Sequence, residues 1–234
     1  MKAIVKRSLF ICLLLPALFA GARVQDTIEL KAASYTKTIT ERADKIVAKL
    51  GIADNKKYES VRQIITQQYR DLNAIYTERD EQVKAAKENL RSDKTALDSA
   101  LKNLESQVTQ KLEKLHPQYL SSLGKKITQE QVDQVKDGMT YGVLPITYKG
   151  YQDMIPTLTA PQKAQILTWL TEARELAMDA ESAEKKHAWF GKYKGRINNY
   201  LSAQGYDSKK EREEWEKRIK AAQAAKQKGE TINQ

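Results

Sequence analysis

Apolar residues recur at intervals of three and four along most of the chain, with charged residues between them. This spacing places the apolar side chains on one face of an α-helix, and no stretch shows the alternation expected of a half-buried strand. The sequence therefore predicts an all-α protein, a helical bundle with one long helix or helical hairpin and a Tyr-rich irregular loop.

The longest helical pattern covers residues 55–115, which contain no glycine and no proline. As one helix this segment would extend for about 90 Å. As an antiparallel hairpin it would turn at the polar residues 91–94, although these lack the glycine or proline that is common in turns. Both alternatives are open at this point. In either case we expect His116-Pro117 to end the element.

Three short motifs predict helix starts, because a Thr followed three residues later by Glu or Gln can cap a helix N-terminus. They begin at Thr38, Thr128 and Thr159. Residues 138–158 combine glycines, prolines and tyrosines, so we expect irregular structure there and not a long helix. A last substantial helix is predicted over residues 182–203.

The N-terminus has the pattern of a secretory signal peptide: basic residues, an apolar stretch, and the small residues Ala20-Gly21-Ala22. The apolar run is too short to cross about 30 Å of hydrocarbon. We therefore expect cleavage near Ala22, no membrane span in the mature form, and a periplasmic or secreted protein. Loss of residues 1–22 also removes Cys12, so the mature chain would have no thiol chemistry.

After the signal peptide we predict a leader over residues 23–37, a single helical domain over 38–208 and a charged helical tail over 209–234. The chain holds 40 Lys and Arg against 30 Asp and Glu, a formal net charge of +10. This surplus favours anionic partners such as surface glycans, lipid headgroups or acidic unfolded chains. Export argues against nucleic acid as a partner.

Known catalytic motifs are absent from the sequence, which has no Gly-rich phosphate loop, no nucleophile elbow and no His-Glu-x-x-His pair. We interpret His116 as a helix-end or surface residue and His187 as part of a solvated helix face, and no metal is expected. Glu172, Glu175 and Asp179 share one side of a helix, which is typical of a solvated face and not of opposed catalytic carboxyls. No cofactor is expected, and a non-enzymatic function is favoured over a lyase using Tyr with Arg or Lys.

Two stretches form the candidate ligand site. Residues 189–200 combine aromatic, basic and amide side chains in one helix that also holds Gly191 and Gly195, each costing about 1 kcal/mol there relative to alanine. Close approach of another backbone is the favoured explanation of these glycines, and a sugar-binding polar face is the alternative. The Tyr-rich segment would cover this helix, or its tyrosines would fill the bundle. The predicted ligand-binding residues are Tyr141, Tyr148, Tyr151, His187, Trp189, Lys192, Tyr193, Arg196 and Asn199.

Several runs of residues resemble a family of secreted Bacteroidetes proteins classed as a domain of unknown function. These runs are 131–145, 151–156, 172–179 and 187–206. The resemblance covers nearly all of the mature chain, from about Thr38 to Ile219. It implies sugar binding connected with polysaccharide use, and it assigns no catalytic or binding residues.

A second resemblance concerns an internal repetition. Residues 127–131 and 158–162 fit an LTxxQ-type pattern that is similar to the repeated motif of Spy-like periplasmic chaperones. Helix capping explains much of this pattern. The leading hypothesis is a non-catalytic glycan-binding or polysaccharide-utilisation accessory protein, with oligosaccharide or glycan-processing proteins as partners. The alternatives are a chaperone or stress adaptor for unfolded client proteins and a scaffold for an outer-membrane assembly.

Overall fold

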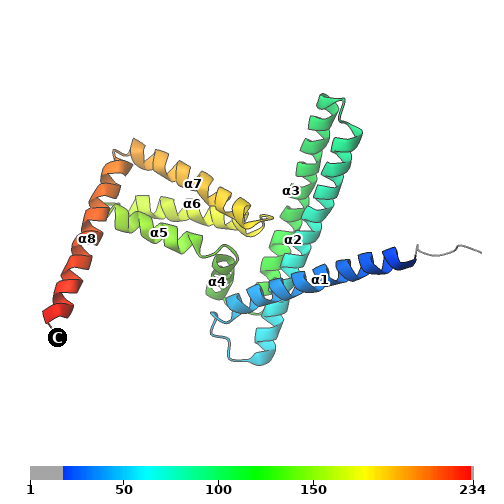
Figure 1. Ribbon diagram of the computed structural model, residues 1–234. Coiled ribbons are helices and arrows are strands. Elements are labelled where there is room, and N and C mark those ends of the chain that lie inside the picture. Colours follow the sequence, from blue (N-terminus) through cyan, green and yellow to red (C-terminus); the bar gives the residue numbers. More distant parts are fainter. Residues whose placement is uncertain (1–17, 233–234) are drawn as a thin grey trace, which may run out of the picture. The chain divides into compact units, whose positions relative to one another are not determined.

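The computed structural model describes residues 18–232, with side chains described for residues 29–225. Over this range the chain forms helices and no strands, which confirms the predicted all-α class. In chain order the helices are α1 (Leu18–Val47), α2 (Asn55–Asn89), α3 (Lys94–Gly124), α4 (Gln129–Met139), α5 (Val143–Met154), α6 (Ala160–Met178), α7 (Ala183–Ala203) and α8 (Ser208–Ile232) (Figure 1). They belong to two compact parts, one ending at Arg42 and one beginning at Ala43.

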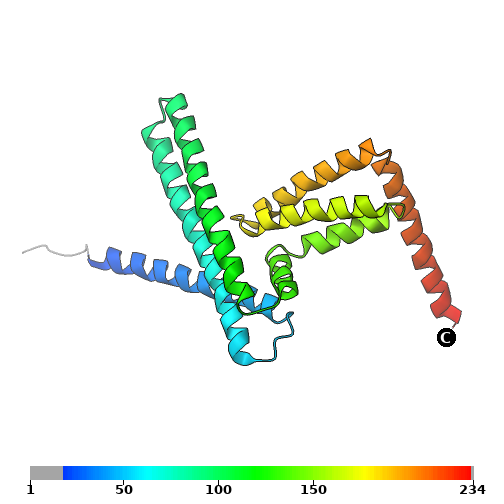
Figure 2. The ribbon, with the colours of Figure 1, turned by 180° about the vertical axis from the view of Figure 1, so that it is seen from behind.

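Residues 55–115 form the hairpin alternative, because α2 and α3 run side by side in opposite directions (Figures 1 and 2). The chain turns at residues 90–93. Asp93 caps α3 by accepting a hydrogen bond of 2.9 Å from the backbone N–H of Ala96, which provides the turn signal in place of a glycine. The hairpin is thus confirmed, and its turn lies at the predicted polar patch.

Helix α3 does not end at His116-Pro117, so that prediction is wrong. Pro117 lies inside α3, which continues for another two turns to Gly124. Proline cannot donate the backbone hydrogen bond of a regular helix. The packing of Tyr119 and Leu123, both buried in the core, offsets this loss and keeps the chain helical.

The predicted helix start at Thr38 is also wrong, because α1 runs through residues 23–37 without a break. The Thr38 hydroxyl donates to the carbonyl of Ser34 over 3.0 Å, a bond within a continuing helix. The capping boxes at Thr128 and Thr159 are confirmed, each with a glutamine three residues later that bonds back to the Thr N–H. The predicted signal peptide lies mostly outside the described residues.

The Tyr-rich segment is helical over most of its length, which corrects the prediction of an irregular loop over 138–158. It is irregular only at residues 140–142 and from Ile155 to the start of α6. Pro145 lies in the first turn of α5, where a missing N–H removes no helical hydrogen bond. The turn before it contains Tyr141 and Gly142, both with positive φ (59° and 67°).

Two hydrophobic cores form within residues 43–234. The first packs the end of α1 against α2, α3 and α4, with Ile65, Leu123 and Val135 fully buried. The second packs α5, α6 and α7 around Phe190 and Ile197. Helix α6 takes part in both, since its last residue belongs to the first core and its middle to the second. The C-terminal end of α6 is therefore held between the hairpin and α7.

Candidate functional site

The end of α6 is fixed by a buried lysine. Lys186 of α7 is 7% exposed, and its ammonium donates to the carbonyls of Ala177 and Met178 over 3.1 and 2.8 Å. The last carbonyls of a helix have no partner within the helix, and positive charge there is favourable. Lys186 thus stabilises the bend between α6 and α7 that presents Asp179 to the hairpin.

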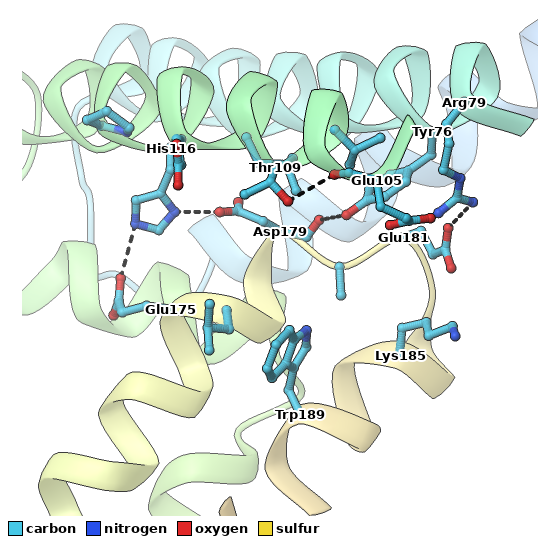
Figure 3. A pocket seen from close by; sticks show the side chains of 16 residues that line it. Tyr76, Arg79, Glu105, Thr109, His116, Glu175, Asp179, Glu181, Lys185 and Trp189 are labelled. Atoms are coloured by element: carbon cyan, nitrogen blue, oxygen red, sulfur yellow. Dashed lines mark hydrogen bonds and ion pairs between the residues drawn. The ribbon is translucent and has the colours of Figure 1, made fainter. Parts of the chain in front are cut away.

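Asp179 joins α6 to both helices of the hairpin (Figure 3). Its carboxylate lies 2.5 Å from His116 Nδ1 on α3 and accepts a weaker hydrogen bond of 3.4 Å from Gln68 on α2. Its backbone carbonyl accepts from the Tyr76 hydroxyl over 2.8 Å. Three side chains separated from Asp179 by 63 to 111 residues therefore converge on one position.

His116 is held between two carboxylates. Its Nε2 lies 3.4 Å from Glu175, which also binds the ammonium of Lys136 at 2.9 Å. Hydrogen bonds to Asp179 and then to Glu175 raise the pKa of His116 to about 9, against the opposing effect of burial. Burial acts to raise the pKa of Glu175, but the bonds from His116 and Lys136 outweigh it and lower that pKa to about 2. At neutral pH His116 is therefore an imidazolium with both N–H groups committed.

Arg174 extends the network to α4. Its side chain is 7% exposed, and it donates to the carboxylates of Asp133 and Asp137 over 2.6 and 3.0 Å. The guanidinium has five N–H donors, so it can hold two carboxylates at once. The predicted solvated row on α6 is consequently wrong at Glu175 and Asp179, which face partners on α3 and α4. Of the three carboxylates in that row, only Glu172 is exposed in the predicted way.

A cavity of about 750 Å³ lies beside this network, within the range of about 300–1,000 Å³ that is usual for small-molecule sites. Figure 3 shows α3 along one side and the Trp189 indole, carried by α7, on the other. The hairpin contributes Tyr76, Arg79, Glu105, Val108, Thr109, Leu112, Glu113, His116 and Pro117. The end of α6 and the start of α7 contribute Glu175, Leu176, Asp179, Ala180, Glu181, Lys185 and Trp189.

Most ionic groups around the cavity already have partners. Arg79 pairs with Glu181 across the cavity edge and with its neighbour Asp80. It also lies over the Tyr76 ring, 5.0 Å from the centroid. Burial, followed by the charges of Glu181 and Asp179, raises the pKa of Tyr76 to about 12, so the phenol stays neutral. The cavity lining thus includes the neutral Tyr76 hydroxyl and the ion pair between Arg79 and Glu181.

Of the predicted ligand residues, Trp189 alone lines this cavity. A helix turns by about 100° per residue, and the others divide between two sides of α7. Towards α6, Lys192 lies 5.2 Å above the Trp189 ring. Burial, followed by the nearby Glu172 carboxylate, raises the pKa of Tyr193, and Arg196 pairs with the same carboxylate at 3.5 Å. The predicted basic and aromatic residues on this side are close together.

On the other side of α7 the predicted residues face α5. His187 stacks on Tyr141 with ring centroids 5.7 Å apart, and the buried Tyr151 donates to Asn198 over 2.8 Å. Tyr148 is half-buried against the second core. Asn199 is exposed and, seven residues after Lys192, lies on the same side of α7 as that lysine. The nine residues therefore do not form one site, and a binding role for each of them stays a prediction.

Close approach of another backbone was the favoured explanation of Gly191 and Gly195 in α7, and it is wrong. A Cβ built on Gly191 or Gly195 meets nothing within 4 Å, so no backbone approaches them closely. Both face open space, and nothing in the structure explains why glycine occupies either position.

Several cavity residues were not predicted from the sequence as site residues. For His116, however, the sequence contains a signal of burial. His116 continues the apolar stripe of Val108 and Leu112 at intervals of four. A polar residue on such a stripe is directed towards the protein and needs a partner. Its position before a proline concealed this signal.

The fold and the cavity define an all-α protein with a cavity of mixed polar and apolar lining that has an indole on one side. The sequence matches the family model described as protein of unknown function (DUF3826) over residues 36–221, and the chain belongs to this family. Among curated proteins no match is found. Among the described residues, no group of three or more His, Cys, Asp or Glu side chains has an arrangement that could hold a metal ion. Within that same range, no helix has the length and apolar character needed to cross a membrane.

Proposed function

We propose that this protein is a non-catalytic carbohydrate-binding protein whose ligand occupies the cavity beside Trp189. The observation that carries the proposal is that the indole on α7 faces polar side chains on α3 across a cavity of about 750 Å³. An indole packs against the C–H face of a sugar ring. The carboxylates and the Thr109 hydroxyl on α3 offer acceptors for sugar hydroxyls.

The ionic network supports binding over acid–base catalysis. A general base needs a pKa near the working pH and a free nitrogen or oxygen. His116 has a pKa of about 9 and both of its ring nitrogens face carboxylates. A glycosidase acid must hold a proton near neutral pH, whereas Glu175 has a pKa of about 2 and is ionised. These groups are better suited to holding the cavity walls together.

We further propose that the protein acts in the periplasm or outside the cell, as an accessory to polysaccharide use. The N-terminal pattern of basic, apolar and small residues supports export. The chaperone alternative gains no support from its LTxxQ-type motifs. The two capping boxes account for the Thr and Gln that these motifs share.

Thermal unfolding against a panel of oligosaccharides tests the carbohydrate-binding proposal. A ligand that binds only the folded state at a hundred times its Kd adds about 2.7 kcal/mol. For a chain of this size that corresponds to a rise in Tm of about 2–4 °C or more. A reproducible rise with one sugar class is the expected result. A panel without any shift would contradict the proposal, and suppression of client aggregation at low salt would then favour a chaperone.

A further inference from the structure

The cavity and the whole chain differ in the sign of their charge. The chain has a formal net charge of +10. The cavity lining has more acidic than basic groups: the carboxylates of Glu105, Glu113, Glu175, Asp179 and Glu181 against the cations of Arg79, His116 and Lys185. Even with His116 protonated, acidic groups outnumber basic ones. The summed formal charge of the lining residues is therefore opposite in sign to that of the whole chain.

The excess acid is concentrated on α3. Glu175, Asp179 and Glu181 are each committed to a cation. The Glu105 backbone carbonyl accepts a hydrogen bond from the Thr109 hydroxyl over 3.0 Å, but no described side chain bonds to the carboxylate of Glu105 or of Glu113. Both residues are exposed to solvent at the cavity. They lie eight residues apart on one helix, which is about 12 Å along the axis. An entering ligand thus meets two uncommitted carboxylates on α3.

The opposite wall offers the Trp189 indole, with two lysines near it. Trp189 is half-buried, and the Lys192 ammonium above its ring does not line the cavity. Lys185 is the one uncommitted cation among the lining residues. An indole attracts a cation over its face and packs equally well on the C–H face of a sugar. The α3 wall therefore favours a sugar that carries positive charge, and the indole offers a surface on which its ring can pack.

We infer that the cavity selects sugars bearing a free amine, with Glu105 and Glu113 as the residues that determine this specificity. The inference rests on the proposed carbohydrate-binding function and names its ligand class. An ammonium group on the sugar would pair with the uncommitted carboxylates of α3 while the ring packs on Trp189. A uronic acid of the same length would place its carboxylate against them, which is unfavourable.

A preference for amine-bearing sugars is the opposite of what non-specific electrostatic attraction predicts. Attraction by a net charge of +10 favours acidic glycans and weakens amine-bearing ones. A preference for an amine can therefore arise only from a local site. This contrast makes the comparison of matched sugars decisive.

The experiment compares four trisaccharides by isothermal titration calorimetry with the whole protein at about pH 6, where sugar amines are protonated. The probes are the glucosamine trimer, its N-acetylated form, cellotriose and trigalacturonic acid. We expect the glucosamine trimer to bind about tenfold or more tightly than trigalacturonic acid. Glu105→Gln and Glu113→Gln should each weaken glucosamine-trimer binding about threefold to tenfold and leave cellotriose binding unchanged. Glu88→Gln, an exposed glutamate on α2 outside the cavity, is the matched control.

The outcomes separate this inference from the proposed function. Equal or tighter binding of trigalacturonic acid or cellotriose would overturn the amine preference and leave carbohydrate binding intact. An unchanged affinity of both α3 variants for the glucosamine trimer would overturn the role of these two glutamates. No binding of any of the four sugars, together with a thermal panel without shifts, would remove the proposed function and this inference with it.

Discussion

At the scale of single residues, the charged link between His116 and Asp179 holds the hairpin against the end of α6. The Asp179 side chain is 11% exposed, and its oxygen lies 2.5 Å from the ring nitrogen of His116. Removing one partner of a buried ion pair leaves the other charge desolvated without compensation. The link is therefore an effective point at which to test the described packing.

We expect Asp179→Ala to lower the free energy of unfolding by about 3 kcal/mol, because it leaves the imidazolium of His116 half-buried with a single partner. Asp80→Ala, which removes an exposed partner of Arg79, should cost less than about 1 kcal/mol. Urea unfolding followed by circular dichroism measures both. Equal losses in the two variants would show that the Asp179 link contributes no more than a surface pair.

The same network predicts how stability depends on pH. The pKa of His116 is raised from 6.5 to about 9, so its contribution is complete below pH 6.5 and is lost as the pH rises through 9. The pKa of Glu175 is lowered from 4.5 to about 2, so its contribution is present above pH 4.5 and is lost as the pH falls towards 2. Between these limits the two groups add no pH dependence.

The measurement is the free energy of unfolding across this pH range for the wild type and His116→Gln. The wild type should lose stability above pH 6.5, and the variant should lose less of it over the same interval. Parallel curves above pH 6.5 would assign the alkaline loss to other groups.

The contacts of single residues were also the features that the sequence predicted least well. Trp189 was identified because it stands out within its own helix. His116, Glu175 and Asp179 were interpreted as solvated, because their partners are distant in the sequence: 63 residues separate His116 from Asp179. Helical periodicity reports which face of a helix is apolar, and it carries no information about which distant charges will meet.

At the scale of elements, replacing a glycine with alanine is expected to change stability in opposite directions in α4 and in α7. A Cβ on Gly138 would lie 2.8 Å from Cγ1 of the buried Ile46, whereas one on Gly191 meets nothing within 4 Å. We expect Gly138→Ala to destabilise the protein by about 1–3 kcal/mol through overpacking. Gly191→Ala should stabilise it by about 0.5–1 kcal/mol through helix propensity. Thermal unfolding of both variants checks the signs, and a destabilised Gly191→Ala would indicate an undetected constraint on α7.

The hairpin should also differ in stability along its length. Among residues 73–107 none is buried, whereas Val61, Ile65 and Leu72 in the proximal part of α2 are. Local opening is easier where few apolar contacts are lost. Hydrogen exchange of backbone amides should therefore be faster in residues 80–104 than in 61–72. Uniform protection along both helices would require a contact for the outer half that the described chain does not provide.

Sequence reasoning succeeded for elements that local interactions define. The capping boxes at Thr128 and Thr159 and the turn before α3 depend on residues within four positions of each other. It failed where tertiary packing decides the outcome. Buried side chains carry α3 through Pro117 and make a helix of the Tyr-rich segment, against the preferences of proline and glycine.

At the scale of the whole molecule, two hydrophobic cores and the ionic network between them border the cavity that we propose as a carbohydrate site. The +10 charge of the chain did not indicate the acidic excess of this cavity, because net charge is a sum over the surface and the cavity is defined by a few converging residues. The test at this scale must therefore perturb the cavity and spare the fold.

The most direct measurement is calorimetric titration of Trp189→Ala with the sugar that stabilises the wild type most. Trp169→Ala is the matched control, because Trp169 is also half-buried against the second core but does not line the cavity. We predict that Trp189→Ala loses at least about tenfold in affinity, or about 1.4 kcal/mol, while folded Trp169→Ala binds as the wild type does. Undiminished binding by folded Trp189→Ala would contradict the assignment of this cavity as the sugar site.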